Sequence, residues 1–296
     1  MSIKMDANYG LGFVEIDDPV GRCVERLESE LAKPNFKAPT LPKAALEVLR
    51  LTNNPRVEAA EILAVVETDA TLAAQLLARA RSPIYGTRPV QSLREAAVRM
   101  GINGLRDLVL QISLRMKVFR APGFEPQVTE IMRFAQVRSN LCHAVNRQSR
   151  FSQPQASMCA LLADLGMATA LMVLAQVPRG ESPPPLNTAW AAALESHETL
   201  GARVGQTWDL PGEIVSVIRH HHQVSVAKVP NPTIATLLVA GVVAEHLNLG
   251  LRGPQGAQFC EDKTQVNGAR RLLGLNTDKM KRIVSQARAM ELDCIV

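Results

Sequence analysis

The chain has 296 residues, of which 47% are hydrophobic and 21% are charged, and its formal net charge is +5 at pH 7. This length allows one large domain or two ordinary ones, and the composition excludes a disordered chain. Because aromatic residues make up only 4% of the chain, packed helices are favoured over β-sandwiches and barrels.

Cysteines, termini and charge exclude several further classes of protein. The five cysteines are scattered without a C-x-x-C pair, which disfavours a disulfide framework and favours a reducing cytoplasm. The polar stretch 1–19 lacks a signal-peptide architecture, and the apolar run 234–244 is shorter than the roughly 20 residues of a membrane span. Basic residues occur mostly singly and without interleaved aromatics, so nucleic acid is not an expected partner. We therefore expect a cytoplasmic protein without membrane contact.

In chain order, the predicted elements begin with a leader, 1–38, that holds one amphipathic helix around 20–32. Asp69 is placed to cap a later helix, and Ser92 with Glu95 forms a capping-box pattern. A five-helix bundle is expected over 39–120, with helices at 42–51, 58–67, 70–81, 93–100 and 104–114.

The second half predicts longer helices. After a break near Pro122, helical patterns cover 129–149, 155–175, 188–208, 211–222 and 233–248. The C-terminal tail, 249–296, begins with a linker-like segment at 250–256 and continues with helices near 267–273 and 277–290. No strand is expected, so the fold class is all-α, with subregions at 39–120 and 125–248 and a helical C-terminal extension.

The residues that could carry chemistry lie in the second half. Asp164 follows Ala163 where a buried His-Asp pair would present a metal ligand, so the histidine of such a pair is missing. The triplet 220–222 is explained either by imidazoles favoured at a helix C-terminus or by neutral histidines that converge on a metal or phosphate. His143 is expected in a core or interface. Serine-nucleophile, Walker and dinucleotide motifs are absent.

Several motifs occur in a recognisable order along the chain. They are Pro39-Thr40-Leu41-Pro42, Thr68-Asp69-Ala70-Thr71-Leu72, Arg81 to Gly86, Val90-Gln91-Ser92-Leu93 with Met100-Gly101, and Trp208-Asp209-Leu210-Pro211. Over residues 39–248 this order resembles the HD-related output domain, HDOD, of bacterial signalling proteins. The resemblance implies kinship with the HD phosphohydrolases, which include cyclic-di-GMP phosphodiesterases of the HD-GYP type.

The resemblance also implies which hydrolase ligands this chain keeps and which it has lost. The kept positions are Asp164, His197 with Gly201, and the pair His221-His222. The changed positions are Ala163 for a histidine, Gln223 for a glutamate, Gly241 for an aspartate, and Arg138 near an upstream histidine. Because a binuclear hydrolytic site needs ligands on both metals, these losses imply a degenerate HD-like core that binds metal poorly. A positive Arg138 would repel a cation further.

We therefore expect a non-catalytic signal-transduction module without metal or cofactor. It would act through an unidentified signalling protein, or through a nucleotide or another anion, and the groove between the two subregions is the expected binding surface. Its vestigial pocket would be a binding site or simply a satisfied polar cluster. The tail is expected either to pack on the bundle or to mediate formation of a homodimer. The pocket residues would be Asp164, His197, His221, His222 and Arg138.

Two alternatives belong to other classes of protein. One is a metal-dependent phosphohydrolase that uses His143, His197 and His221 as replacement ligands. The other is a nucleic-acid-associated regulator that relies on the net charge of +5.

Overall fold

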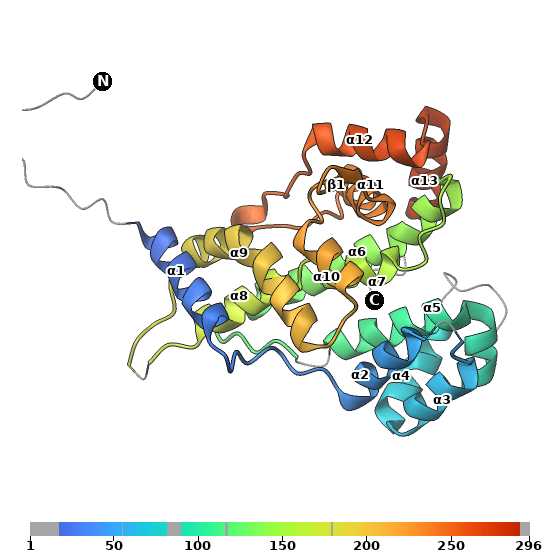
Figure 1. Cartoon of the computed structure of the whole chain (residues 1–296), viewed down its shortest axis with the longest axis horizontal. Helices are drawn as coiled ribbons and strands as arrows, with labels where there is room; N and C mark the ends of the chain where they lie inside the picture. Colours follow the sequence, from blue (N-terminus) through green and yellow to red (C-terminus); the bar gives the residue numbers. More distant parts are fainter. Residues whose placement is uncertain (1–17, 55, 82–89, 116–117, 179, 291–296) are drawn as a thin grey trace, which may run out of the picture.

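The computed structural model describes residues 18–54, 56–81, 90–115, 118–178 and 180–290, and these ranges are almost entirely helical (Figure 1). The predicted all-α class is confirmed. The helices are α1 (Pro19–Ala32), α2 (Lys43–Thr52), α3 (Ala59–Glu67), α4 (Ala70–Ala80), α5 (Leu93–Arg115), α6 (Glu125–Gln148), α7 (Ala156–Leu162), α8 (Leu165–Ala175), α9 (Leu186–Thr207), α10 (Gly212–Arg219), α11 (Pro232–His246), α12 (Lys263–Leu273) and α13 (Thr277–Met290), with a short 3-10 turn, η2 (Pro254–Gly256).

The prediction that the chain has no strand is wrong at one hairpin. Strands β1 (Ser225–Val226) and β2 (Val229–Pro230) pair antiparallel. Their connection places Ala227 and Lys228 at φ 48° and 67°, where glycine or asparagine is the usual residue. The hairpin therefore carries no conventional turn signature in the sequence.

Helices α2–α5 form the N-terminal bundle, which lies at one end of the molecule in Figure 1. The expected caps are present, because Asp69 Oδ1 accepts from Leu72 N at 3.0 Å and Ser92 Oγ accepts from Glu95 N at 3.1 Å. Gly101, at φ 69°, has a non-helical backbone that divides α5 into the two helices expected there. The motif over 81–86 extends into residues that the structure does not describe.

Helices α6–α11 form the core that holds the site, and α1 packs against α8 and α9 of this core. The guanidinium of Arg26 donates to the carbonyl oxygen of Val173 at 3.0 Å and to that of Gln176. The Trp208 indole donates to the carbonyl oxygen of Pro39 at 2.8 Å. Helix α1 and the segment that begins at Pro39 are therefore both attached to the core by hydrogen bonds.

One continuous helix was expected over 155–175, but the chain divides there into α7 and α8. Asp164 has φ −94° and ψ 10°, so the helix is interrupted where this residue turns toward the interior. The segment Ala156–Ala175 is long and apolar enough to cross a membrane, yet all of it is buried inside the protein. In this structure it forms the centre of the core.

The crossing of α8 over α9 is unusually close because glycine occupies both surfaces. A Cβ at Gly166 would lie 1.8 Å from the carbonyl oxygen of His197, and one at Gly201 would lie 3.4 Å from the backbone nitrogen of Gly166. These glycines therefore allow Asp164, two residues before Gly166, to approach His197, four residues before Gly201.

The C-terminal tail is helical, as predicted, and it packs on the core. Helix α12 contacts α11, and α13 contacts α6. Arg150, just after α6, uses its backbone N–H to donate to Leu273 O at 3.0 Å and its Nε to donate to Leu272 O at 2.8 Å. Dimerisation through the tail stays a prediction.

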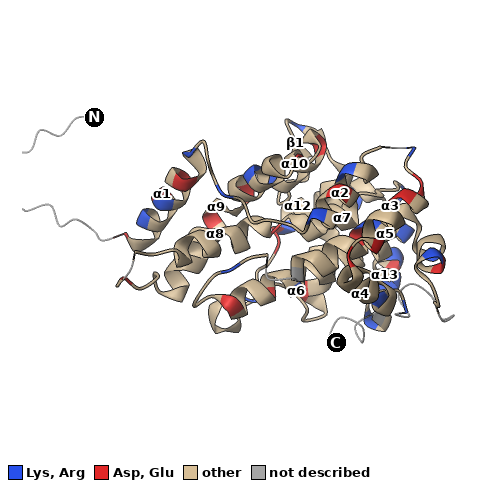
Figure 2. Cartoon of the chain, turned by 90° about the horizontal axis from the view of Figure 1, so that it is seen from below, with Lys and Arg blue, Asp and Glu red and all other residues tan. Residues whose placement is uncertain are grey.

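Charged residues of both signs are interspersed over the helices in Figure 2. This distribution matches the modest net charge of +5. It gives no support to the long single-sign stripe with which proteins usually follow a nucleic-acid backbone.

The close α8–α9 crossing makes a prediction about stability. Gly166→Ala should lower the free energy of unfolding by about 3 kcal/mol or more, because its methyl group collides with backbone that cannot move away. Gly212→Ala is the matched control, since a Cβ there meets no atom within 4 Å, and it should change stability by less than about 1 kcal/mol. Urea denaturation measures both, and equal effects would contradict the steric explanation.

Candidate functional site

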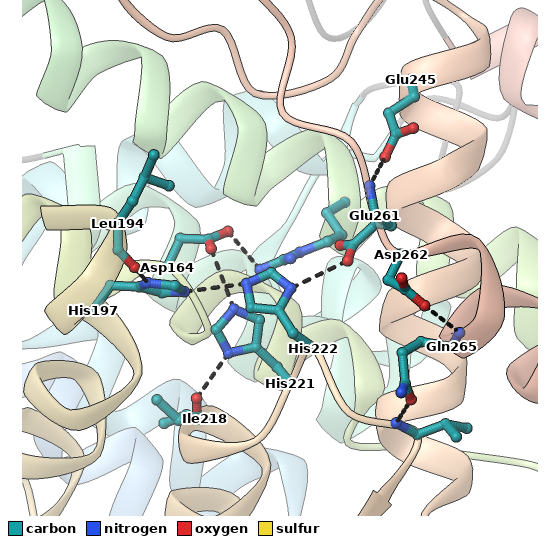
Figure 3. A network of polar contacts seen from close by, with 12 residues as sticks. Asp164, Leu194, His197, Ile218, His221, His222, Glu245, Glu261, Asp262 and Gln265 are labelled. Atoms are coloured by element: carbon teal, nitrogen blue, oxygen red, sulfur yellow. Dashed lines mark hydrogen bonds and ion pairs between the residues drawn. The ribbon is translucent and has the colours of Figure 1, made fainter. Parts of the chain in front are cut away.

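Four residues with metal-ligating side chains converge inside the core (Figure 3). Asp164 comes from the α7–α8 turn, His197 from α9, and His221 and His222 from the segment after α10. Their potential ligand atoms all lie within 4.8 Å of one another. The structure thus brings together the four kept ligand positions named in the sequence analysis, although they lie far apart in the sequence.

Arg138 is the fifth predicted residue, and it binds Asp164 directly. Its Nη2 lies 2.5 Å from Asp164 Oδ2, and the side chains are 1% and 5% exposed. Its guanidinium also lies 5.0 Å from the centre of the Phe134 ring, within the range of a cation–π contact. Burial alone would raise the pKa of the Asp164 carboxyl, but Arg138 and then His221 hold that pKa well below its usual range. A fixed cation therefore neutralises the buried carboxylate.

Each of the three histidines has an oxygen acceptor at Nδ1. His197 Nδ1 lies 2.6 Å from Leu194 O, His221 Nδ1 lies 2.8 Å from Ile218 O, and His222 Nδ1 lies 3.1 Å from a carboxylate oxygen of Glu261. These acceptors favour the tautomer with the proton on Nδ1, which leaves the Nε2 lone pairs facing inward. This outer arrangement is the one that metal-binding histidines usually have.

The inward-facing Nε2 atoms of two of these histidines lie within hydrogen-bonding distance of each other. Nε2 of His197 and Nε2 of His222 are 3.1 Å apart. Nε2 of His221 lies 3.4 Å from Asp164 Oδ1 without making a hydrogen bond. Two lone pairs at 3.1 Å repel each other, so a proton or a cation between the rings would stabilise this arrangement.

The pKa shifts show which ring takes a proton most readily. Burial lowers the pKa of His221 to about 3, and burial also lowers that of His197. Burial opposes the charge on His222 too, but the hydrogen bond to Glu261 and the negative charge of Glu261 outweigh it and raise the pKa of His222. Of the three rings, His222 is therefore the one that takes up a proton most readily.

Glu261 is a site residue that the sequence did not reveal. It precedes α12, lies 39 positions beyond His222 in the sequence, and is only 7% exposed. A Cβ at Gly241 would lie 2.9 Å from Glu261 Oε1, so this side chain occupies the space beside Gly241. Its backbone N–H donates to Glu245 Oε1 at 2.8 Å. A carboxylate thus reaches the position where the family resemblance implied a lost aspartate.

Two residues named in the sequence analysis do not reach the cluster. His143 lies on α6 with Asp107, Arg147 and Arg106 as its charged neighbours, so the proposed ligand set of His143, His197 and His221 is wrong. Five residues separate His143 from Arg138, which rotates it about 140° around the helix. Gln223 is exposed, and it supplies no donor to the interior.

The cavity at the cluster is small. Its volume of about 10 Å³ suits one water molecule or one monatomic ion. Sites for drug-sized ligands have roughly 300–1,000 Å³, so the pocket as it stands does not hold a nucleotide. A larger groove, of about 1290 Å³, lies at the segment that joins the bundle to the core, and its lining includes Phe119, Pro122, Met132 and Leu249. Its lining comes from residues between 114 and 133 and between 248 and 252, and the binding surface expected between the two subregions stays a prediction.

Comparison with known proteins identifies the family to which this sequence is similar. The family model of the HDOD domain matches residues 38–224, which is more than half of the chain. An uncharacterized protein of Treponema pallidum (strain Nichols) is 24% identical over 233 residues, which cover 75% of this chain and 45% of the relative. The chain therefore spans less than half the length of that relative.

Three solved structures share the fold. An HDOD domain protein of unknown function from Geobacter sulfurreducens is 19% identical, with a TM-score of 0.63 over 92% of this chain and 95% of that one. A proposed metal-dependent phosphohydrolase of Shewanella amazonensis SB2B is 14% identical, with a TM-score of 0.65 over 92% and 98%. A proposed signal transduction protein of Marinobacter aquaeolei VT8 is 19% identical, with a TM-score of 0.64 over 94% and 65%. At these identities the likeness concerns the fold.

The buried ion pair makes a prediction about stability. Arg138→Met should lower the free energy of unfolding by about 3–5 kcal/mol, because it leaves Asp164 charged and buried without its partner. The double variant Arg138→Met with Asp164→Asn should recover much of this loss, because no unpaired charge then remains. Urea denaturation of both variants at pH 7.5 is the measurement, and a double variant no more stable than the single one would count against this explanation.

The lowered pKa of His221 makes a prediction about pH. The unfolded chain takes up a proton near pH 6.5, whereas folded His221 does so only near its pKa of about 3, so stability falls as the pH drops through this window. At pH 5 the loss from His221 is about 2 kcal/mol. The free energy of unfolding should therefore fall less between pH 7.5 and pH 5 in His221→Asn than in the wild type. Identical pH dependence in the two proteins would show that His221 is not the group responsible.

Proposed function

The chain belongs to the HDOD domain family, and we propose that it is a non-catalytic regulatory module of bacterial signal transduction. The observation that carries this proposal is the buried ion pair between Arg138 and Asp164. It places a permanent positive charge on the carboxylate that a binuclear hydrolase would use to bridge its two metals.

A binuclear hydrolytic site needs a second metal position, and this chain lacks the ligands for it. Arginine stays protonated in proteins, so Arg138 cannot give up its charge to admit a metal beside Asp164 Oδ2. Ala163 has no donor atom, and Gly241 has no side chain. Binuclear activation of a water molecule is therefore unsupported by these residues.

The remaining donors do fit one cation. Nε2 of His197, His221 and His222, together with Oδ1 of Asp164, would hold an ion of the zinc, nickel or cobalt type, for which imidazole is a suitable ligand. When bound, such an ion would supply a compact positive charge and Lewis acidity. Since the cavity leaves no room for a substrate of nucleotide size, we assign the ion a structural or regulatory role.

The larger groove is the candidate surface for a protein partner. It lies at the connection between the bundle and the core, where a partner would contact both subregions. Its lining combines apolar side chains with the exposed Arg120 and Arg252. We propose a signalling protein as the partner and the cytoplasm as the compartment, and we do not favour nucleic acid.

An enzymatic function is the second candidate, because four potential ligands do gather at one point. Hydrolysis of bis(p-nitrophenyl) phosphate and of cyclic di-GMP, with manganese, iron or zinc supplied, distinguishes the two. We expect the wild type to show no more turnover than His197→Ala, since only one metal position has ligands. Turnover that is present in the wild type and lost in His197→Ala would overturn the proposal.

A further inference from the structure

The C-terminal extension, defined here as residues 249–290, forms one wall of the histidine cluster. The family match ends at residue 224, so this wall lies outside the matched domain. Leu251 and Phe259 line the cavity, and the Phe259 ring lies 5.2 Å from the His222 ring, centre to centre. Glu261 then reaches His222 Nδ1 (Figure 3). The extension therefore contacts the cluster through apolar groups and one carboxylate.

The charge balance makes Glu261 important for any cation that enters. Asp164 is already neutralised by Arg138, and the site otherwise consists of imidazoles. Glu261 supplies the negative charge that acts most strongly on His222, and Glu198 adds a weaker attraction at His197. Without Glu261, a divalent ion would enter a region in which the fixed charges of the ion pair already cancel.

We infer that Glu261 couples the C-terminal extension to one divalent transition-metal ion held by His197, His221, His222 and Asp164. A metal on His222 Nε2 withdraws electrons from the ring and makes Nδ1–H a stronger donor to Glu261. Glu261 in turn makes the ring a better ligand and orients it. Because such coupling is reciprocal, metal binding stabilises the docked extension to the same degree that docking strengthens metal binding. This inference goes beyond the proposed regulatory function.

Metal titration of the full chain tests the first half of the coupling. Protein freed of metal by a chelator is titrated with Zn²⁺ alone, and affinity is measured by competition with a chromophoric chelator. Glu261→Gln should weaken binding about 10–100-fold, as expected on loss of an outer carboxylate. Asp262→Asn is the matched control, because this neighbouring carboxylate caps α12 by accepting from Gln265 N at 2.9 Å and does not touch His222. Its Zn²⁺ affinity should equal that of the wild type.

Hydrogen exchange in the extension tests the second half. Zn²⁺ should slow exchange over α12 and the segment before it in the wild type and in Asp262→Asn, but not in Glu261→Gln or His197→Ala. His197→Ala removes a ligand without touching the extension, so it separates binding in the cluster from binding elsewhere. Glu261→Asp, which keeps the charge and shortens the reach, should give an intermediate affinity if Glu261→Gln folds poorly.

Two results would overturn the inference. One is Zn²⁺ affinity in Glu261→Gln equal to that of the wild type, and the other is a wild type that neither binds Zn²⁺ nor changes its exchange. A wild type that binds no Zn²⁺ would also remove the single ion assigned to this site above. Neither result bears on the proposal that the module is non-catalytic, which fails only if hydrolysis that depends on His197 is found.

Discussion

A carboxylate without access to water is the constraint on which the centre of this molecule depends. Asp164 is 4% exposed, and the free energy needed to remove its charge from water must be offset by charges and donors held nearby. Arg138 of α6 supplies the charge, and the segment after α10 supplies imidazoles. Burial of this carboxylate therefore brings α6, the α7–α8 turn and the segment after α10 together. The site and the core are consequently one unit.

The same meeting point depends on the absence of side chains at two glycines. The carbonyl oxygen of His197 occupies the space that a Cβ of Gly166 would need, which brings the backbones of α8 and α9 into contact. Because the backbones are that close, the side chains of His197 and Asp164 lie near each other in the same part of the core. Gly241 plays a comparable part on α11, because its missing side chain leaves room for Glu261. The positions of these glycines therefore determine where the polar side chains of the site can lie.

Sequence patterns were sufficient for the features that depend on neighbouring residues. Apolar periodicity located the helices. The cap at Asp69 could be predicted because its partner, Leu72, is only three residues away. The break at Ala163-Asp164 was missed because the apolar composition continues on both sides of it. The alternative ligand set that included His143 was wrong because a helix face cannot be read reliably without knowing its rotation. Glu261 was missed because its partner His222 lies 39 residues earlier, and its local sequence has no distinguishing pattern.

The hydrogen bond from Trp208 to the carbonyl oxygen of Pro39 spans 169 residues and has a consequence for synthesis on the ribosome. Helices α2–α5 contact one another locally and can assemble as soon as they emerge. The hydrogen bond to Pro39 can form only after Trp208 has been made. Helix α1 can pack only after α8 and α9 have been made. Helix α1 is therefore made before the helices against which it packs, and its apolar face has no partner among them until they emerge.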